Sequence, residues 1–72
     1  IPQIIDELNS LKKRVTSENQ EVIDETIVAI QNNDNHKIKK YLTSIADFGK
    51  DVLKDVSSSV LLAYMHSLGI IP

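Results

Sequence analysis

The chain has no cysteine and no tryptophan, and its 72 residues include only two glycines and two prolines. Without cysteine, no disulfide can stabilise the fold, and a cysteine-based metal site is excluded. Two glycines cannot form a glycine-rich phosphate-binding loop. A chain of this size buries only about 60% of its unfolded surface, so its core is marginal. We therefore expect self-association to supply part of the stability.

An excess of charge of one sign is also lacking. Eight lysines and arginines stand against ten aspartates and glutamates, and no segment is a block of one sign. This pattern does not predict nucleic-acid binding. No signal peptide is visible, and the absence of cysteine is compatible with the cytoplasm, which is the expected location. Because the chain begins with Ile1 rather than methionine, we interpret residues 1–72 as a single helical domain of a larger protein.

The longest regular pattern runs from Asp34 to Leu68, where apolar residues recur every three or four positions. This spacing is that of one helix face, with lysines and aspartates on the opposite face. Asp34 suits the N-cap position, and Gly69 suits the position that follows a helix. The pattern predicts one helix over residues 35–68, roughly 50 Å long.

Two shorter amphipathic helices are predicted over residues 3–15 and 18–31. Ser17 and Gln20 have the spacing of a capping box, which places the second start near Glu18. The predicted fold class is all-α, with three helices: a short antiparallel hairpin and a long C-terminal helix whose second half projects. The expected core consists of seven aliphatic residues: Ile5, Leu8, Ile23, Ile27, Ile30, Leu42 and Ile45.

The C-terminal part of the predicted long helix is apolar around most of its circumference. Residues 60–65 form a continuous apolar run, and such a segment needs partners on more than one side. The run is too short to span a membrane, which takes about 20 apolar residues. We therefore expect a homo-oligomer, a dimer or a tetramer. Its expected interface consists of Val52, Val56, Val60, Ala63, Tyr64 and Leu68.

Residues capable of catalysis are present, but they lack the partners that catalysis needs. His36 and His66 have no ligand or base at helical spacing, so we interpret both as surface or interface residues. Ser57, Ser58 and Ser59 lie in no nucleophile elbow and indicate a close helix approach or a bend. No enzyme activity, cofactor or small-molecule substrate is expected.

Two groups of charged residues on the predicted long helix are candidate metal or phosphate sites. Asp47, Asp51 and Asp55 recur every four positions, as metal-binding carboxylates do, but lysines run beside them. Such alternation is typical of a solvated helix face. The basic group comprising His36, Lys37, Lys39 and Lys40 lacks arginine and aromatic partners, so we interpret it as solvated too.

Gly49 lies on the apolar stripe of the predicted long helix. A glycine inside a helix costs about 1 kcal/mol relative to alanine. Either close packing by another helix compensates for this cost, or the irregularity is tolerated. The sequence also leaves open whether the helix bends at Gly49 or at the serines of residues 57–59.

Residues 32–65 read NNDNHKIKKYLTSIADFGKDVLKDVSSSVLLAYM. This run resembles helical C-terminal segments of bacterial abortive-infection and related phage-defence proteins. In those segments a hairpin rich in acids and aliphatic residues precedes a long helix whose middle reads like IADFGKDV, residues 45–52 here. The resemblance implies an accessory or oligomerising segment attached to a separate effector domain, and it assigns no functional residue.

These observations predict a non-catalytic homo-oligomerisation or scaffolding domain that acts through its long C-terminal helix. Its mechanism would be to raise the local concentration of whatever is fused to it. Two alternatives remain open. The chain could be a membrane-active helical effector tail, which liposome binding would reveal, or a docking module for another protein.

Overall fold

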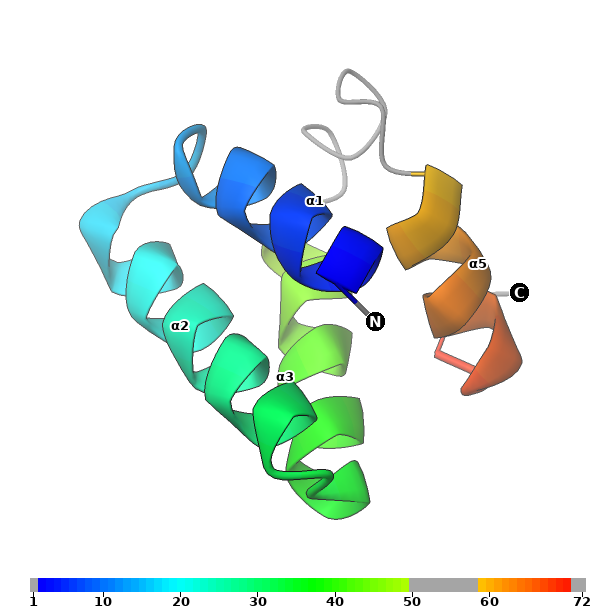
Figure 1. The fold of residues 1–72 in the computed structure, drawn as a ribbon. Helices are drawn as coiled ribbons and strands as arrows, with labels where there is room; N and C mark the ends of the chain where they lie inside the picture. The colour runs from blue at the N-terminus through cyan, green and yellow to red at the C-terminus, as the bar shows by residue number, and fades with distance from the viewer. Residues whose placement is uncertain (1, 50–58, 71–72) are drawn as a thin grey trace.

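The computed structural model describes residues 2–49 and 59–70, and these residues form four α-helices and no strand (Figure 1). The helices are α1 (Pro2–Lys12), α2 (Ser17–Gln31), α3 (Asn35–Phe48) and α5 (Ser59–Ser67). The expected all-α class is confirmed. The expected number of helices is wrong, because the described part of the chain holds four helices rather than three.

The single helix predicted over residues 35–68 does not form, because α3 ends at Phe48. The Gly49 N–H donates to the Ile45 carbonyl oxygen at 2.7 Å. A Cβ atom on residue 49 would lie 2.8 Å from that oxygen, so this position requires glycine. The fold measures 26 × 25 × 21 Å, and residues 2–49 and 59–70 contain no helix of the roughly 50 Å expected from the sequence.

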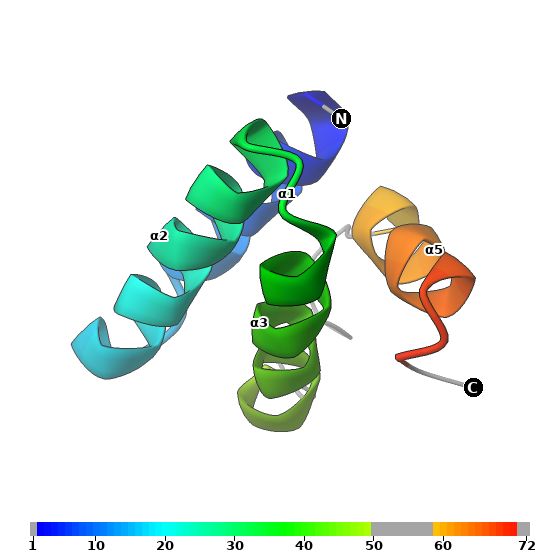
Figure 2. The same cartoon turned by 90° about the horizontal axis from the view of Figure 1, so that it is seen from below.

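The C-terminal segment therefore folds back onto the chain instead of projecting. α1 packs against both α2 and α5, and α2 packs against α3. In both views α5 lies beyond α1 and α3 on the side away from α2 (Figures 1 and 2). Leu61 and Met65 of α5 are fully buried in the chain's own core. The surface expected to need a second copy is thus partly covered within one chain.

One hydrophobic core joins all four described helices. Five of the seven expected core residues are buried, whereas Ile5 and Ile27 are partly buried against them. The buried hydrophobic residues are Ile4, Leu8, Leu11, Ile23, Ala29, Ile30, Ile38, Leu42, Ile45, Leu61 and Met65. Thr26 is also fully buried, and its hydroxyl donates to the Val22 carbonyl oxygen at 2.8 Å.

The turn between α2 and α3 is set by two polar residues. Asn33 adopts a left-handed conformation with φ 55°, which asparagine tolerates better than most residues. Its N–H donates to the Ile30 carbonyl oxygen, and the Asp34 N–H donates to that of Ala29. Asp34 is also the N-cap of α3, as predicted, because it accepts the Lys37 N–H at 3.2 Å. This turn closes α2 and opens α3 within three residues.

Three other helix ends lie within three residues of their predicted positions. α2 begins at Ser17, one residue before the predicted start, because Thr16 rather than Ser17 is its N-cap and accepts the Asn19 N–H. α1 ends at Lys12, three residues before the predicted end. Gly69 follows α5 with φ 75°, as expected for the residue after a helix.

The first turn of α5 is capped by a side chain from the opposite end of the chain. The Leu61 N–H donates to Glu7 Oε1 at 3.1 Å, across 54 positions of sequence. N–H groups in the first turn of a helix have no partner within the helix, and the helix dipole favours a negative charge there. Glu7 therefore ties α5 to α1 at the point where the chain returns to its own core.

We expect Gly49→Ala to lower the free energy of unfolding by about 1 kcal/mol, because the new methyl group would crowd the Ile45 carbonyl oxygen. If the helix instead ran unbroken through residue 49, the same change would raise the free energy of unfolding by about 1 kcal/mol. Denaturant unfolding monitored by circular dichroism distinguishes the two signs. Ala46→Gly, inside α3, is the control and should lose stability in either case.

We expect Glu7→Ala to lower the free energy of unfolding by about 1–2 kcal/mol, because the α5 cap is lost. Alanine is a better helix former than glutamate, so the effect on α1 alone would be a small increase in the free energy of unfolding. The matched control is Asp6→Ala, which removes an exposed acid from the same helix. Hydrogen exchange should accelerate at the Leu61 amide in Glu7→Ala only. Equal losses in both variants would contradict the cap.

Candidate functional site

The predicted interface residues fall into three groups in the structure. Val52 and Val56 lie outside the described residues. Val60 is 40% exposed and Ala63 is exposed, whereas Tyr64 and Leu68 are partly buried against the core. The described part of the predicted interface thus lies on α5, and it presents Val60 and Ala63 to solvent.

Within residues 60–67, the exposed residues of α5 are Val60, Ala63, His66 and Ser67. Val60, Ala63 and Ser67 are spaced three and four positions apart and are all exposed; we call them the α5 outer face. The Ser67 hydroxyl donates to the Tyr64 carbonyl oxygen at 2.6 Å, so its own helix satisfies it. The opposite side of the helix carries the buried Leu61 and Met65. α5 is therefore apolar on both sides, and only one side is covered.

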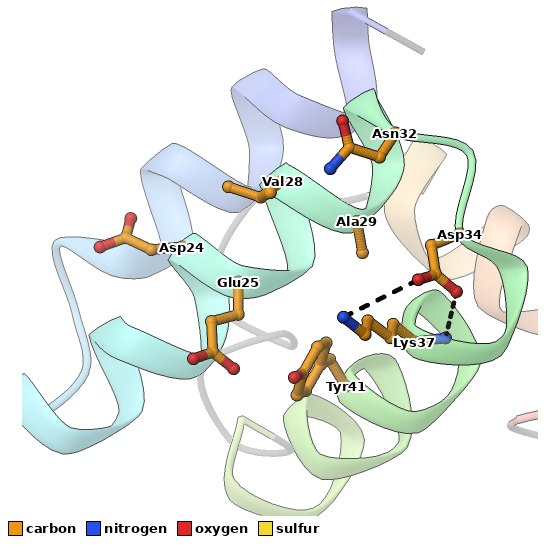
Figure 3. A pocket seen from close by; sticks show the side chains of 8 residues that line it. All are labelled: Asp24, Glu25, Val28, Ala29, Asn32, Asp34, Lys37 and Tyr41. Atoms are coloured by element: carbon orange, nitrogen blue, oxygen red, sulfur yellow. Dashed lines mark hydrogen bonds and ion pairs between the residues drawn. The ribbon is translucent and has the colours of Figure 1, made fainter.

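A second surface feature lies between α2 and α3, where an open pocket of about 330 Å³ is formed (Figure 3). We call it the acidic groove. Its residues are Asp24, Glu25, Val28, Ala29, Asn32, Asp34, Lys37 and Tyr41. Val28 is 52% exposed, more than Val60 of the α5 outer face. In the sequence, Val28 lies slightly off the line of apolar residues that α2 buries. This position is the one feature of the sequence that indicates exposed apolar surface at the groove.

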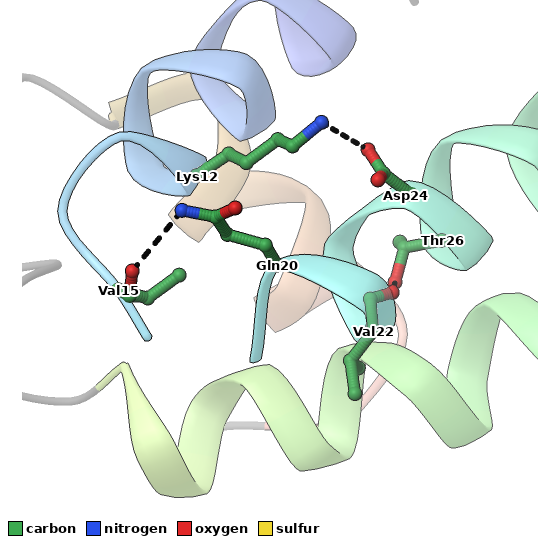
Figure 4. Close-up of polar contacts among 6 residues, drawn as sticks. All are labelled: Lys12, Val15, Gln20, Val22, Asp24 and Thr26. Carbon is green, nitrogen blue, oxygen red and sulfur yellow. Dashed lines mark hydrogen bonds and ion pairs between the residues drawn. The ribbon is translucent and has the colours of Figure 1, made fainter. Parts of the chain in front are cut away.

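The groove carries three carboxylates and one ammonium group. Lys37 Nζ lies 3.9 Å from Asp34 Oδ2, and the Lys37 side chain lies between Ala29 and Tyr41 in the view of Figure 3. Asp24 pairs with Lys12 of α1 at 2.7 Å, which ties α1 to α2 (Figure 4). Glu25 forms no ion pair with any described residue. The groove therefore keeps a net negative charge.

Tyr41 shares the groove with Glu25, and Figure 3 shows the phenol hydroxyl directed toward that carboxylate. Hydrogen bonding to Glu25 raises the pKa of Tyr41 above its ordinary value of 10.0. Burial of the hydroxyl and the negative charges of Glu25 and Asp34 raise the pKa further. Tyr41 is therefore neutral at physiological pH and adds no charge to the groove.

A third feature lies on α3 beside the groove. His36, Lys39, Lys40 and Thr43 are exposed and line a shallow depression of about 390 Å³; we call them the basic face. Their spacing places them along one side of the helix. Lys40 Nζ lies 6.0 Å from the centre of the Tyr41 ring, at the boundary between the basic face and the groove.

The structure brings no catalytic or metal-binding set together among the residues that it describes. His36 and His66 are exposed on different helices, and no group of three or more His, Cys, Asp or Glu side chains in the described ranges could hold a metal ion. Asp47 is exposed on α3, whereas Asp51 and Asp55 lie outside the described residues, as do Ser57 and Ser58. Within residues 2–49 and 59–70, no helix has the length and apolar character needed to cross a membrane.

The fold and its surfaces define a small all-helical protein with an apolar C-terminal helix face and a charged groove between two hairpin helices. Comparisons with protein-family models, with curated proteins and with solved structures found no match to this chain.

We expect Tyr41 to titrate above pH 10.0, and Glu25→Gln to return its pKa toward that value, because the carboxylate is the main cause of the shift. The fold favours the neutral phenol. Its contribution to stability is therefore complete below pH 10.0 and is lost as pH rises through the folded-state pKa. Ultraviolet titration of a Tyr64→Phe chain follows Tyr41 alone. An unchanged pKa in Glu25→Gln would contradict the contact.

Proposed function

We propose that this protein is a non-catalytic homo-oligomerisation domain whose copies associate through the α5 outer face. The observation that carries the proposal is that α5 is apolar on both sides. Leu61 and Met65 are fully buried in the chain's own core, while Val60 on the other side is 40% exposed. A helix with two apolar sides needs a second partner, and the chain itself covers only one side.

A second copy is the occupant that fits this face. In a two-fold contact the same patch lies on both sides, so the face must be complementary to itself. Val60, Ala63 and Ser67 are small and carry no charge, and the hydroxyl of Ser67 is already satisfied within its helix. Two such faces can approach closely with no carboxylate, lysine or arginine between them, and the exposed His66 lies at the edge of the contact.

The association we propose joins chains that are already folded. The chain exposes 4570 Å² of surface, and a compact monomer of this mass is expected to expose about 4,500 Å². The chain therefore buries as much surface as an ordinary monomer of its mass. This agreement does not support the expectation from the sequence that the core needs a partner for part of its stability. α5 has nine residues and is about 13 Å long, so its outer face is a small contact. We therefore propose reversible, concentration-dependent association.

The role that follows is scaffolding, since self-association raises the local concentration of anything joined to the chain. The likeness of residues 32–65 to segments of bacterial phage-defence proteins offers one setting for such a role, and it stays a prediction. A membrane-active tail is the weaker alternative, because Leu61 and Met65 are already buried inside the protein. Docking onto a different protein is the other alternative.

The test is the molar mass of the chain by light scattering across a concentration series, for the natural sequence and for Val60→Asp. We expect the mass to rise with concentration in the natural chain and to stay that of a monomer in the variant. Residue 60 lies in the first turn of α5, where the helix dipole favours an acid, so the variant should remain folded. Asn9→Asp, an exposed site on α1, adds the same charge elsewhere and should behave like the natural chain.

Three results would contradict this proposal. The natural chain could remain a monomer at every concentration, or Val60→Asp and Asn9→Asp could weaken association equally. Binding of the natural chain to liposomes, lost in Val60→Asp, would assign the α5 outer face to a membrane instead.

A further inference from the structure

Two surfaces of opposite charge lie on neighbouring sides of α3. The acidic groove holds three carboxylates and one ammonium group, whereas the basic face holds Lys39, Lys40 and His36. We propose that the acidic groove of one copy binds the basic face of a second copy. This inference rests on the proposed self-association and adds a second contact to it.

On the acidic side, the groove combines negative charge with exposed apolar surface. Glu25 forms no ion pair with a described residue, and the half-exposed Val28 lies one turn further along α2. α2 contains four acidic residues, all between residues 18 and 25, and no lysine or arginine, so the exposed side of its N-terminal part is negative. A lysine from a partner could pair with Glu25 while its methylene chain covers Val28.

On the basic side, the cations are available for a partner. Neither Lys39 nor Lys40 forms an ion pair with a described residue, and α3 has no acidic residue before Asp47. The Thr43 hydroxyl is satisfied by the Lys39 carbonyl oxygen at 2.7 Å, so the partner need not supply a hydrogen bond to it. The basic face is thus complementary to the groove in charge and offers lysine side chains to it.

The two surfaces cannot meet within one chain, because they occupy different sides of the same helix. The groove uses Lys37 and Tyr41 of α3, whereas the basic face uses residues 36, 39, 40 and 43. A contact of one groove with one basic face is head to tail, and it leaves a free groove at one end and a free basic face at the other. Such heterologous contacts extend into rings or filaments.

The head-to-tail contact is expected to be weak on its own. Exposed ion pairs contribute about 0.2–1 kcal/mol each and are screened by salt. When the α5 outer faces already join two copies, however, each further contact forms at an effective concentration in the millimolar range. Weak contacts between charged surfaces can then extend the assembly, and salt can reverse it.

The test uses two charge-reversal variants, each of which keeps one of the two surfaces. Lys39→Glu keeps the groove, and Glu25→Lys keeps the basic face. Both carry Val60→Asp so that the α5 outer face does not contribute. Isotope-labelled Lys39→Glu chain is titrated with unlabelled Glu25→Lys chain at low salt, and amide shifts are followed by nuclear magnetic resonance. Circular dichroism checks that both variants are folded.

We expect saturable shifts at the groove amides of Val28, Ala29 and Asn32, with a 1:1 end point. Adding salt should weaken this binding by about tenfold or more. Unlabelled Lys39→Glu is the matched control titrant. It lacks the complete basic face and should bind the groove about tenfold more weakly or not at all.

Absence of groove shifts with Glu25→Lys, or equal shifts with both titrants, would overturn the inference. Groove shifts caused by a lysine–leucine peptide but not by Glu25→Lys would also overturn it, and would assign the groove to a basic segment of another protein. Because the α5 outer face is blocked throughout, these results do not depend on the light-scattering test. Either contact can fail while the other stands.

Discussion

The return of α5 onto α1 is the contact on which the rest of the structure depends. It combines one directional interaction, the Leu61 N–H donated to Glu7, with the burial of two large side chains, Leu61 and Met65. Full burial of such side chains contributes about 1.5–3 kcal/mol each. In a chain without disulfides, this closure joins the two ends of the sequence and completes the core. The same contact orients the outer face of α5 toward solvent.

The end of α3 at Phe48 makes that return possible. A helix continued through residue 68 would extend roughly 50 Å, and nothing else in the chain is long enough to cover it. Gly49 accepts the tight contact with the Ile45 carbonyl oxygen, and the chain can then leave the helical path. Because α3 ends there, Leu61 and Met65 of α5 can be buried in the core. Tertiary packing of this kind supplies most of the stability of helices in proteins.

Features that depend on neighbouring residues could be predicted from the sequence, and features that depend on distant ones could not. Asp34 as an N-cap and the left-handed Gly69 follow from local chemistry, and most core positions follow from helical periodicity. The end of α3 at Phe48 could not be predicted, because the same apolar spacing suits two arrangements. In one the helix continues and a second copy covers its apolar face, and in the other the C-terminal segment packs on the chain's own core. The burial of Thr26 does not follow from the sequence pattern, because a polar residue is expected at the surface. Its hydroxyl donates a hydrogen bond within its own helix, and this bond allows the side chain to be buried. The groove was missed because it depends on how α2 and α3 meet at the Asn33 turn.

The candidate surfaces therefore depend on different parts of the fold. The α5 outer face exists because the C-terminal segment folds back, and the groove exists because Asn33 and Asp34 turn α2 into α3. The basic face is one side of α3 alone. A symmetric contact through α5 uses apolar surface and should be little affected by salt, whereas a head-to-tail contact through α3 uses charge and should weaken with salt. One symmetric contact alone stops at a dimer, but the two kinds together link dimers into larger assemblies. The two proposed contacts would together make the extent of assembly depend on ionic strength as well as on concentration.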